Sequence, residues 1–168
     1  MFTPEEIAAR ARAMQAALAR HIAPTPLEER ELDGRAVLLK REDRLPTGSF
    51  KLRGAFNAMR KVIPDHDLFV CASAGNHAQG VAFMCRHFDV HGVIFMPVTT
   101  PQQKVMKTKM FGGDNVEVRL IGDYFDQTLA QAKAFCEGEG AHFLSPFDDD
   151  DVIDDDDVVD DDDVISDE

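Results

Sequence analysis

Between residues 68 and 147, short apolar runs alternate with longer segments whose apolar residues recur at helical spacing. Apolar runs of about four to eight residues, bounded by turn residues, are typical of buried strands. The predicted strands are 68–74, 91–98, 115–122 and 141–147, and the predicted helices are 77–88, 101–113 and 123–140. This order predicts an α/β fold, an open parallel sheet with helices on both faces and right-handed crossovers.

Two of the predicted helices have features that bear on their stability and on the face that they bury. Gly80 weakens the helix predicted at 77–88, because glycine has a low helix propensity. In the helix predicted at 123–140, four apolar residues lie near one stripe, which we expect to face the sheet. They are Phe125, Leu129, Ala132 and Phe135.

The residues before this region predict a helix, an extended segment, a strand and a second helix. Thr3 as N-cap, Pro4 at the first helical position and acidic residues in the first turn predict a helix at the N-terminus. Prolines make 23–29 an extended segment, and 35–43 has the composition of a strand. A helix at about 52–62 should pack on the sheet that follows.

The acidic residues are concentrated at the C-terminus. Residues 148–168 hold fourteen of the 31 acidic residues and no Lys or Arg; twelve of the fourteen lie in three copies of a six-residue unit, and Asp167 and Glu168 follow. The remainder has 17 acidic and 18 basic residues, and no basic stripe indicates nucleic-acid binding. Dense like charge predicts a disordered tail; weak calcium binding or an artificial segment are alternatives.

Cysteine and histidine spacing argues against disulfides and metal centres. Cys71, Cys85 and Cys136 are odd in number and lack CxxC spacing, so we expect free thiols, with Cys71 in the core. The six histidines form no known metal motif. No apolar run approaches the length of a membrane span, and the N-terminus lacks the features of a secretory signal. We therefore expect a cytoplasmic protein.

The stretch PTGSFKLRGA (46–55) places Lys51 at the start of a predicted helix, directly after Phe50. A lysine amine can act as a nucleophile or bind a carbonyl cofactor covalently. By position alone, a lysine in the first helical turn is more often solvated. This stretch therefore leaves both interpretations open.

The stretch CASAGNHAQG (71–80) runs from a predicted strand through a turn into a helix. Ligands bind at the carboxyl ends of strands in open α/β sheets, and a helix N-terminus presents N–H groups to anions. Ser73 and Asn76 add side-chain donors, and Gly75 allows close approach of the backbone. A plain loop with Asn76 as N-cap is the alternative. The chain has no GxGxxG, so it gives no indication of a dinucleotide site.

Together these stretches resemble the lysine and asparagine-loop motifs of the fold-type II pyridoxal-phosphate enzymes, and in particular threonine dehydratase (threonine ammonia-lyase). The resemblance runs through most of residues 22–153 and includes TPL (25–27), LKRED (39–43), IFMPVTTPQQKV (94–105) and IGDYFDQTLAQA (121–132). Serine dehydratase and serine racemase are close alternatives within the same family.

The resemblance implies a role for each site residue. Lys51 would form the Schiff base with pyridoxal phosphate and then act as base at the substrate Cα, with Phe50 against the pyridine ring. Asn76 would hydrogen-bond the phenolic oxygen of the ring. The substrate carboxylate would be held by Ser73, Ala74, Gly75, Asn76 and His77. The reaction implied is β-elimination from threonine, giving 2-oxobutanoate and ammonia in isoleucine biosynthesis.

The resemblance also implies domain limits and a homo-oligomer. Residues 1–50 would be a helix and strand segment of the family's large domain, 51–147 the α/β small domain, and 148–168 the disordered acidic tail. Most of the large domain would be missing. The sequence lacks the family's glycine-rich phosphate loop; its only glycine pair is Gly112-Gly113. We therefore expect the chain to be inactive alone, with a non-catalytic domain or a module acting through its acidic tail as alternatives.

Overall fold

The computed structural model of the chain describes residues 3–145. The expectations for the acidic repeat at 148–168 lie outside these residues. None of the helices described is long and apolar enough to span a membrane.

The central feature is a four-stranded parallel sheet with strand order β5-β4-β3-β6. Each strand was predicted, but each is shorter than its apolar run. The strands are β3 (Leu68–Ala72), β4 (His91–Met96), β5 (Val116–Leu120) and β6 (His142–Phe143). The α/β prediction is confirmed.

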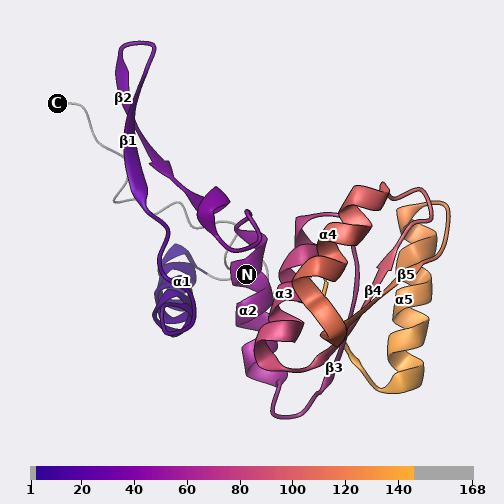
Figure 1. Cartoon of the computed structure of the whole chain (residues 1–168). Helices are drawn as coiled ribbons and strands as arrows, with labels where there is room; N and C mark the ends of the chain where they lie inside the picture. The colour runs from indigo at the N-terminus through magenta and orange to yellow at the C-terminus, as the bar shows by residue number, and fades with distance from the viewer. Residues whose placement is uncertain (1–2, 146–168) are drawn as a thin grey trace.

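Helices cover both faces of the sheet, as predicted (Figure 1). Because successive strand residues point to opposite faces, Phe69 and Cys71 enter one core while Val70 and Ala72 enter the other. The first core is covered by α2 (Lys51–Val62), α3 (Asn76–Phe88) and α4 (Gln102–Gly112), and the second by α5 (Phe125–Glu139).

The buried stripe of α5 differs from the one predicted. Its buried residues are Thr128, Ala132 and Cys136, while Leu129 and Phe135 pack at the sides of the same core. The prediction for Phe125 was wrong, since its side chain is 38% exposed. Phe125 opens the helix, and the hydroxyl of Thr128, which donates to the carbonyl of Ile121, helps to hold that first turn against the preceding loop.

The first helix begins where the sequence predicted. Thr3 is the N-cap of α1 (Pro4–Leu18), and its side chain and that of Glu6 cap each other's backbone N–H groups in a capping box. At the other end, Met14 and Leu18 are buried in the core that α2 shares.

A separate hairpin follows α1 and projects from the rest of the molecule (Figure 1). Strands β1 (Leu27–Leu32) and β2 (Arg35–Lys40) pair antiparallel, and Asp33 and Gly34 both have positive φ in the two-residue turn. The predicted strand at 35–43 ends at Lys40, since η1 (Glu42–Arg44) follows it.

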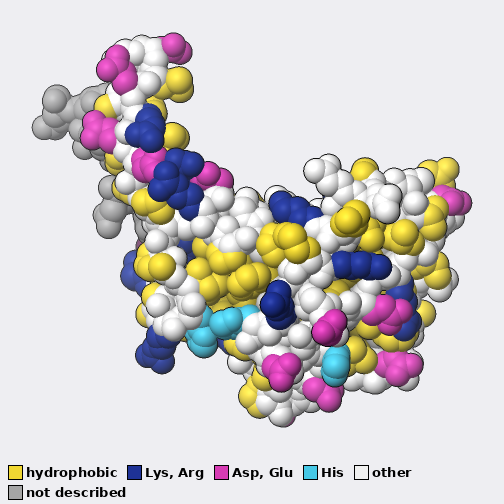
Figure 2. All heavy atoms as spheres, in the orientation of Figure 1, with side chains coloured by type: hydrophobic (Ala, Val, Ile, Leu, Met, Phe, Trp, Pro, Cys, Tyr) yellow, Lys and Arg dark blue, Asp and Glu magenta, His cyan; other side chains and the backbone are white. Residues whose placement is uncertain are grey.

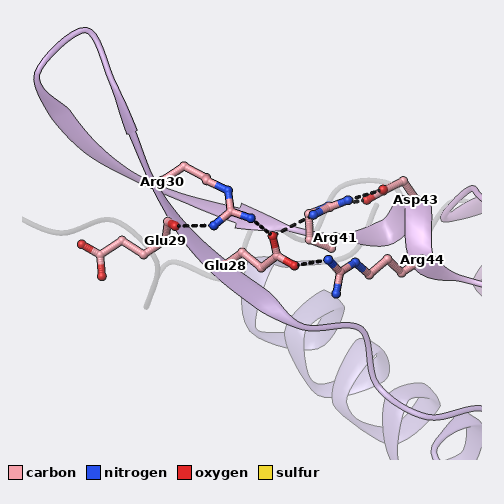
Figure 3. Close-up of polar contacts among 6 residues, drawn as sticks. All are labelled: Glu28, Glu29, Arg30, Arg41, Asp43 and Arg44. Carbon is pink, nitrogen blue, oxygen red and sulfur yellow. Dashed lines mark hydrogen bonds and ion pairs between the residues drawn. The ribbon is translucent and has the colours of Figure 1, made fainter.

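The base of this hairpin is tied together by an ion-pair cluster (Figure 3). The carboxylate of Glu28 lies 2.6 Å from a guanidinium nitrogen of Arg30, 2.7 Å from Arg41 and 2.5 Å from Arg44. Asp43 pairs with Arg41 as well. The cluster links β1 to the segment that leads into η1 and then into α2.

Candidate active site

The candidate site lies at the carboxyl end of β3. From β3 the chain passes through α3 to β4 on one side, and it returns as β6 on the other side. This reversal of direction is the place where open α/β sheets bind ligands. The loop Ser73–Gly75 and the start of α3 occupy it.

The β3–α3 loop is held by two hydrogen bonds that its backbone N–H groups donate, one to a backbone carbonyl and one to a side chain. The N–H of Ser73 donates to the carbonyl of Phe95 at 3.0 Å, and the N–H of Gly75 donates to Oγ of Ser73 at 3.2 Å. The helix begins at Asn76 with Gly75 as N-cap, so the alternative of Asn76 as N-cap was wrong. The first-turn N–H groups of α3 lack acceptors within their own helix and suit an anion. Asn76 is exposed at this edge.

His77 is buried directly behind this first turn. Its Nε2 lies 3.2 Å from the carbonyl oxygen of Leu144 and donates to it, joining α3 to the segment after β6. Burial lowers the pKa of His77 to about 4, and the charge of Lys51 contributes. The imidazole is therefore neutral near pH 7. Its Nδ1 has no hydrogen-bond partner among residues 3–145.

Lys51 is the first residue of α2 and follows a tight turn. Gly48 has a φ of +72° and donates its N–H to the carbonyl of Leu45 at 2.7 Å. Oγ of Ser49 accepts the N–H of Lys51 at 3.3 Å. The amine of Lys51 lies 5.3 Å from the centre of the Phe50 ring, and Phe50 is 39% exposed. An amine and an aromatic face therefore lie side by side at the start of this helix.

Close contact between α2 and α3 brings the two motifs together. A Cβ at position 80 would lie 3.0 Å from the carbonyl oxygen of Lys51, closer than such atoms ordinarily approach. Gly80 therefore permits the two helices to touch at Lys51. His77 lies one helical turn before Gly80, which agrees with the electrostatic influence of Lys51 on it. The glycine that weakened the predicted helix is required by this packing.

A partly buried polar network around Arg53 holds the start of α2 in place. Arg53 donates from Nε and Nη2 to the two carboxylate oxygens of Glu42, at 2.6 and 2.9 Å, and from Nη1 to the side chain of Gln15. Thr25 donates to Glu42 as well. Burial would raise the pKa of Glu42, but the hydrogen bonds from Arg53 and Thr25 outweigh it and hold the pKa below its ordinary value. The network thus joins four segments of the chain at Arg53, which lies two positions after Lys51.

This network was not predicted from the sequence. Glu42 and Arg53 lie within the two stretches that carry the resemblance, LKRED and KLRG. The signal that the sequence offered was Arg53, a charged residue among apolar neighbours in a predicted helix. Because Arg is rarely buried without a partner, its position indicated a buried ion pair or hydrogen bond. Its partner could not be identified from spacing alone.

The cysteines and histidines offer no second site in the described part of the chain. Cys71, Cys85 and Cys136 are free thiols, and Cys71 lies in the core as expected; Cys85 and Cys136, for which burial was not predicted, are buried as well. Burial raises the pKa of Cys71 above its ordinary range and that of Cys85 to about 12, so neither is a thiolate near pH 7. Residues 3–145 contain no group of three or more potential metal ligands.

The chain is similar to known proteins over most of its length. The family described as "Pyridoxal-phosphate dependent enzyme" matches residues 18–155. The L-threonine dehydratase biosynthetic IlvA of Bacillus subtilis (strain 168) is 50% identical over 119 residues, which cover 70% of this chain and 28% of that protein. The chain thus spans less than a third of that relative's length.

Solved structures share the fold. The processed form of threonine deaminase isoform 2 from Solanum lycopersicum has a TM-score of 0.78 and 35% identity, covering 92% of this chain and 44% of that one. Maize serine racemase has a TM-score of 0.78 and 26% identity, covering 87% of this chain and 45% of that one. Less than half of each of these chains is matched.

Proposed function

This chain belongs to the pyridoxal-phosphate dependent enzyme family, and from that premise we propose that residues 51–80 form the amine and carboxylate part of a threonine-deaminating site. The products would be 2-oxobutanoate and ammonia. The observation that carries the proposal is the contact of Gly80 with the backbone of Lys51, which joins the two helix starts. The similarity to threonine dehydratase and threonine deaminase supports the choice of substrate.

The described residues fit one part of pyridoxal phosphate. Lys51 supplies an amine for its aldehyde, and Phe50 supplies a partly exposed aromatic face beside that amine. The phosphate needs several N–H donors, ordinarily from a glycine-rich turn. Gly112-Gly113 cannot serve, because the pair lies before the amino end of β5 whereas the candidate site is at the carboxyl end of β3, and Gly112 packs on Val116. We place the phosphate contacts outside residues 3–145.

Each residue of the site has one task in this proposal. Pyridoxal phosphate, when bound, supplies an electron sink for the electrons of the substrate's Cα–H bond. Lys51 would hold the cofactor covalently through Nζ, and its amine, when free, would take the proton from the substrate Cα. Phe50 would pack on the ring, and the amide of Asn76 would donate to its phenolic oxygen.

The start of α3 holds the substrate carboxylate. Ser73 and the backbone N–H groups of Ala74–His77 surround it, and the helix N-terminus favours its negative charge. The imidazole of His77 already donates to Leu144, so His77 contributes its backbone N–H. Fixing the carboxylate orients the Cα–H bond toward Lys51, and elimination of the β-hydroxyl follows.

Two other functions fit the same fold. A serine dehydratase or serine racemase would use the same lysine, and the likeness to maize serine racemase keeps that substrate class open. A non-catalytic α/β domain would keep the packing and never bind the cofactor. The partners we propose are a small amino acid and further copies of the chain, in the cytoplasm.

Covalent labelling separates these possibilities. The full chain is mixed with pyridoxal phosphate and reduced with borohydride, and the modified lysines are mapped by mass spectrometry. We expect one dominant adduct, on Lys51, which disappears in Lys51→Ala. Lys61, at the end of the same helix, serves as the matched control: Lys61→Ala should leave the adduct intact. Labelling spread over many lysines would contradict the proposed site.

A further inference from the structure

Strand β5 forms one of the two outer edges of the sheet, opposite the two-residue strand β6, and pairs only with β4 in the described part of the chain (Figure 1). The N–H of Ile121 donates to the carbonyl of Met96 on β4 at 2.9 Å. Because successive residues of a strand direct their N–H and C=O groups to alternate sides, the groups of Val116, Val118 and Leu120 point away from β4. This edge therefore presents backbone donors and acceptors.

The side chains of β5 form a pattern that is symmetric about Val118. The strand reads Val-Glu-Val-Arg-Leu. Val116 and Val118 pack toward the core under α4. Glu117 and Arg119 lie on the α5 face, where the Arg119 guanidinium is 4.4 Å from the centre of the Phe135 ring. Reversing the strand leaves the apolar positions unchanged and exchanges the acid for the base.

We propose that two copies of this chain associate by antiparallel pairing of β5 with β5, about a two-fold axis at Val118. In this register Val118 faces Val118 of the second copy, and Val116 faces Leu120. Glu117 of each copy faces Arg119 of the other, so the charges attract at both symmetric positions. Each pair of facing apolar residues exchanges two N–H···O bonds.

The order of the charged residues on β5 favours a second copy of the chain over other strands as its pairing partner. Charged residues on an edge strand ordinarily prevent pairing between strands. Here the two charges are opposite and symmetrically placed, so a reversed copy of the same strand is complementary to them. In the single chain these side chains pair along their own strand at 2.8 Å and remain partly exposed. Their arrangement is therefore already formed before association.

Exposed apolar side chains near this edge add area to the proposed contact. Leu120 is 47% exposed and Tyr124 is 71% exposed just after the strand. Met106 is 62% exposed on α4, the helix that packs against β5 through Gly112. Space-filling representation shows hydrophobic side chains exposed on the body of the molecule as well as on the hairpin (Figure 2).

Cysteine cross-linking of the full chain tests the register. In Val118→Cys the two introduced thiols face each other with Cα atoms about 5.5 Å apart, within the range that a disulfide spans. In the control Leu120→Cys the introduced thiols are about 13 Å apart along the strands, although that position is more exposed. We expect disulfide dimers from Val118→Cys and their loss in Leu120→Cys. The native cysteines are buried and should not contribute.

Charge exchange gives an independent test by sedimentation velocity. Glu117→Arg and Arg119→Glu should each weaken the dimer about tenfold, because each places like charges in both symmetric pairs. The double exchange E117R/R119E should recover most of that loss. Circular dichroism confirms that each variant is folded.

Three results would overturn the proposal. They are a chain that stays monomeric at every concentration, equal cross-linking of the two cysteine variants, and a double exchange no tighter than the single reversals. The last result would be expected if association used the exposed leucines of the β1–β2 hairpin, which carry no such charge pattern.

Discussion

At the scale of single residues, the site depends on small differences in environment. Lys51 and His77 both lie in first helical turns, yet Lys51 is beside a partly exposed ring whereas His77 is enclosed. The donor bond to Leu144 fixes the tautomer of His77 with its proton on Nε2. The buried, neutral imidazole thus links α3 to the segment after β6 through this hydrogen bond.

This burial predicts a pH dependence of stability. The pKa of His77 is lowered to about 4 from an ordinary value of 6.5, so the unfolded chain binds the proton more readily. The contribution of His77 is complete above about pH 6.5 and is lost as pH falls toward about 4. At full loss it amounts to about 3 kcal/mol.

The measurement is thermal unfolding between pH 4 and 7, for the unaltered chain and for His77→Gln, whose amide can still donate to Leu144. The loss of stability on acidification should be smaller in the variant. Parallel curves for the two proteins would show that His77 is not the titrating group.

At the scale of elements, the proposed site is made by two helices, α2 and α3, whose N-terminal parts are in contact. Neither helix positions its motif alone: α3 needs Gly80 to approach α2, and α2 needs the Arg53–Glu42 pair to hold its first turn. The pair lies near the hairpin base and α1, so the N-terminal segments contribute to the position of Lys51. The proposed division of the chain at residue 50 stays a prediction.

Breaking the Arg53–Glu42 pair, in which Arg53 is buried and Glu42 partly buried, should destabilise the chain and disturb the proposed site. Arg53→Met leaves the carboxylate of Glu42 without its main partner, which should cost about 2–4 kcal/mol of unfolding free energy. It should also reduce borohydride-trapped adduct on Lys51, measured under conditions where the variant is folded.

The matched control is Arg30→Met, which removes an exposed arginine that also pairs with a glutamate. Its cost should stay below about 1 kcal/mol. Chemical denaturation of both variants gives the comparison. If both cost the same, the buried network does not hold α2 in place.

At the scale of the whole molecule, the described residues form one face of the proposed site and a hairpin with no third strand among them. A two-stranded hairpin is marginally stable by itself, and here the ion-pair cluster around Glu28 supports its base. Four of its leucines are exposed: Leu27, Leu32, Leu38 and Leu39.

We expect this chain alone to deaminate threonine no faster than free pyridoxal phosphate does. Residues 3–145 hold the proposed amine and carboxylate contacts but no glycine-rich turn for the phosphate, so the cofactor would not be retained in position. Formation of 2-oxobutanoate from threonine is the measurement, with Lys51→Ala as the control. Turnover that exceeds free cofactor and is abolished by Lys51→Ala would refute this expectation.

Much of the fold could be predicted because it depends on local patterns. Apolar runs identified each strand of the sheet, and Thr3, Pro4 and the acidic first turn identified the start of α1. Strand and helix periods arise from backbone geometry, so they can be read in sequence order. The bounds of the elements were predicted less accurately than their order. The extent of the buried stripe of α5 was wrong at Phe125, because the end of such a stripe depends on which residues pack opposite it.

The sequence by itself determined the strand–helix order, the free cysteines and the two motifs that resemble one family. Only the tertiary structure decided that Gly80 rests on Lys51, that His77 is bonded to Leu144, and that Arg53 is paired with Glu42. These contacts join residues from 11 to 67 positions apart in the chain. Their partners are chosen by the packing of whole helices on the sheet, and no periodicity in the sequence records that choice.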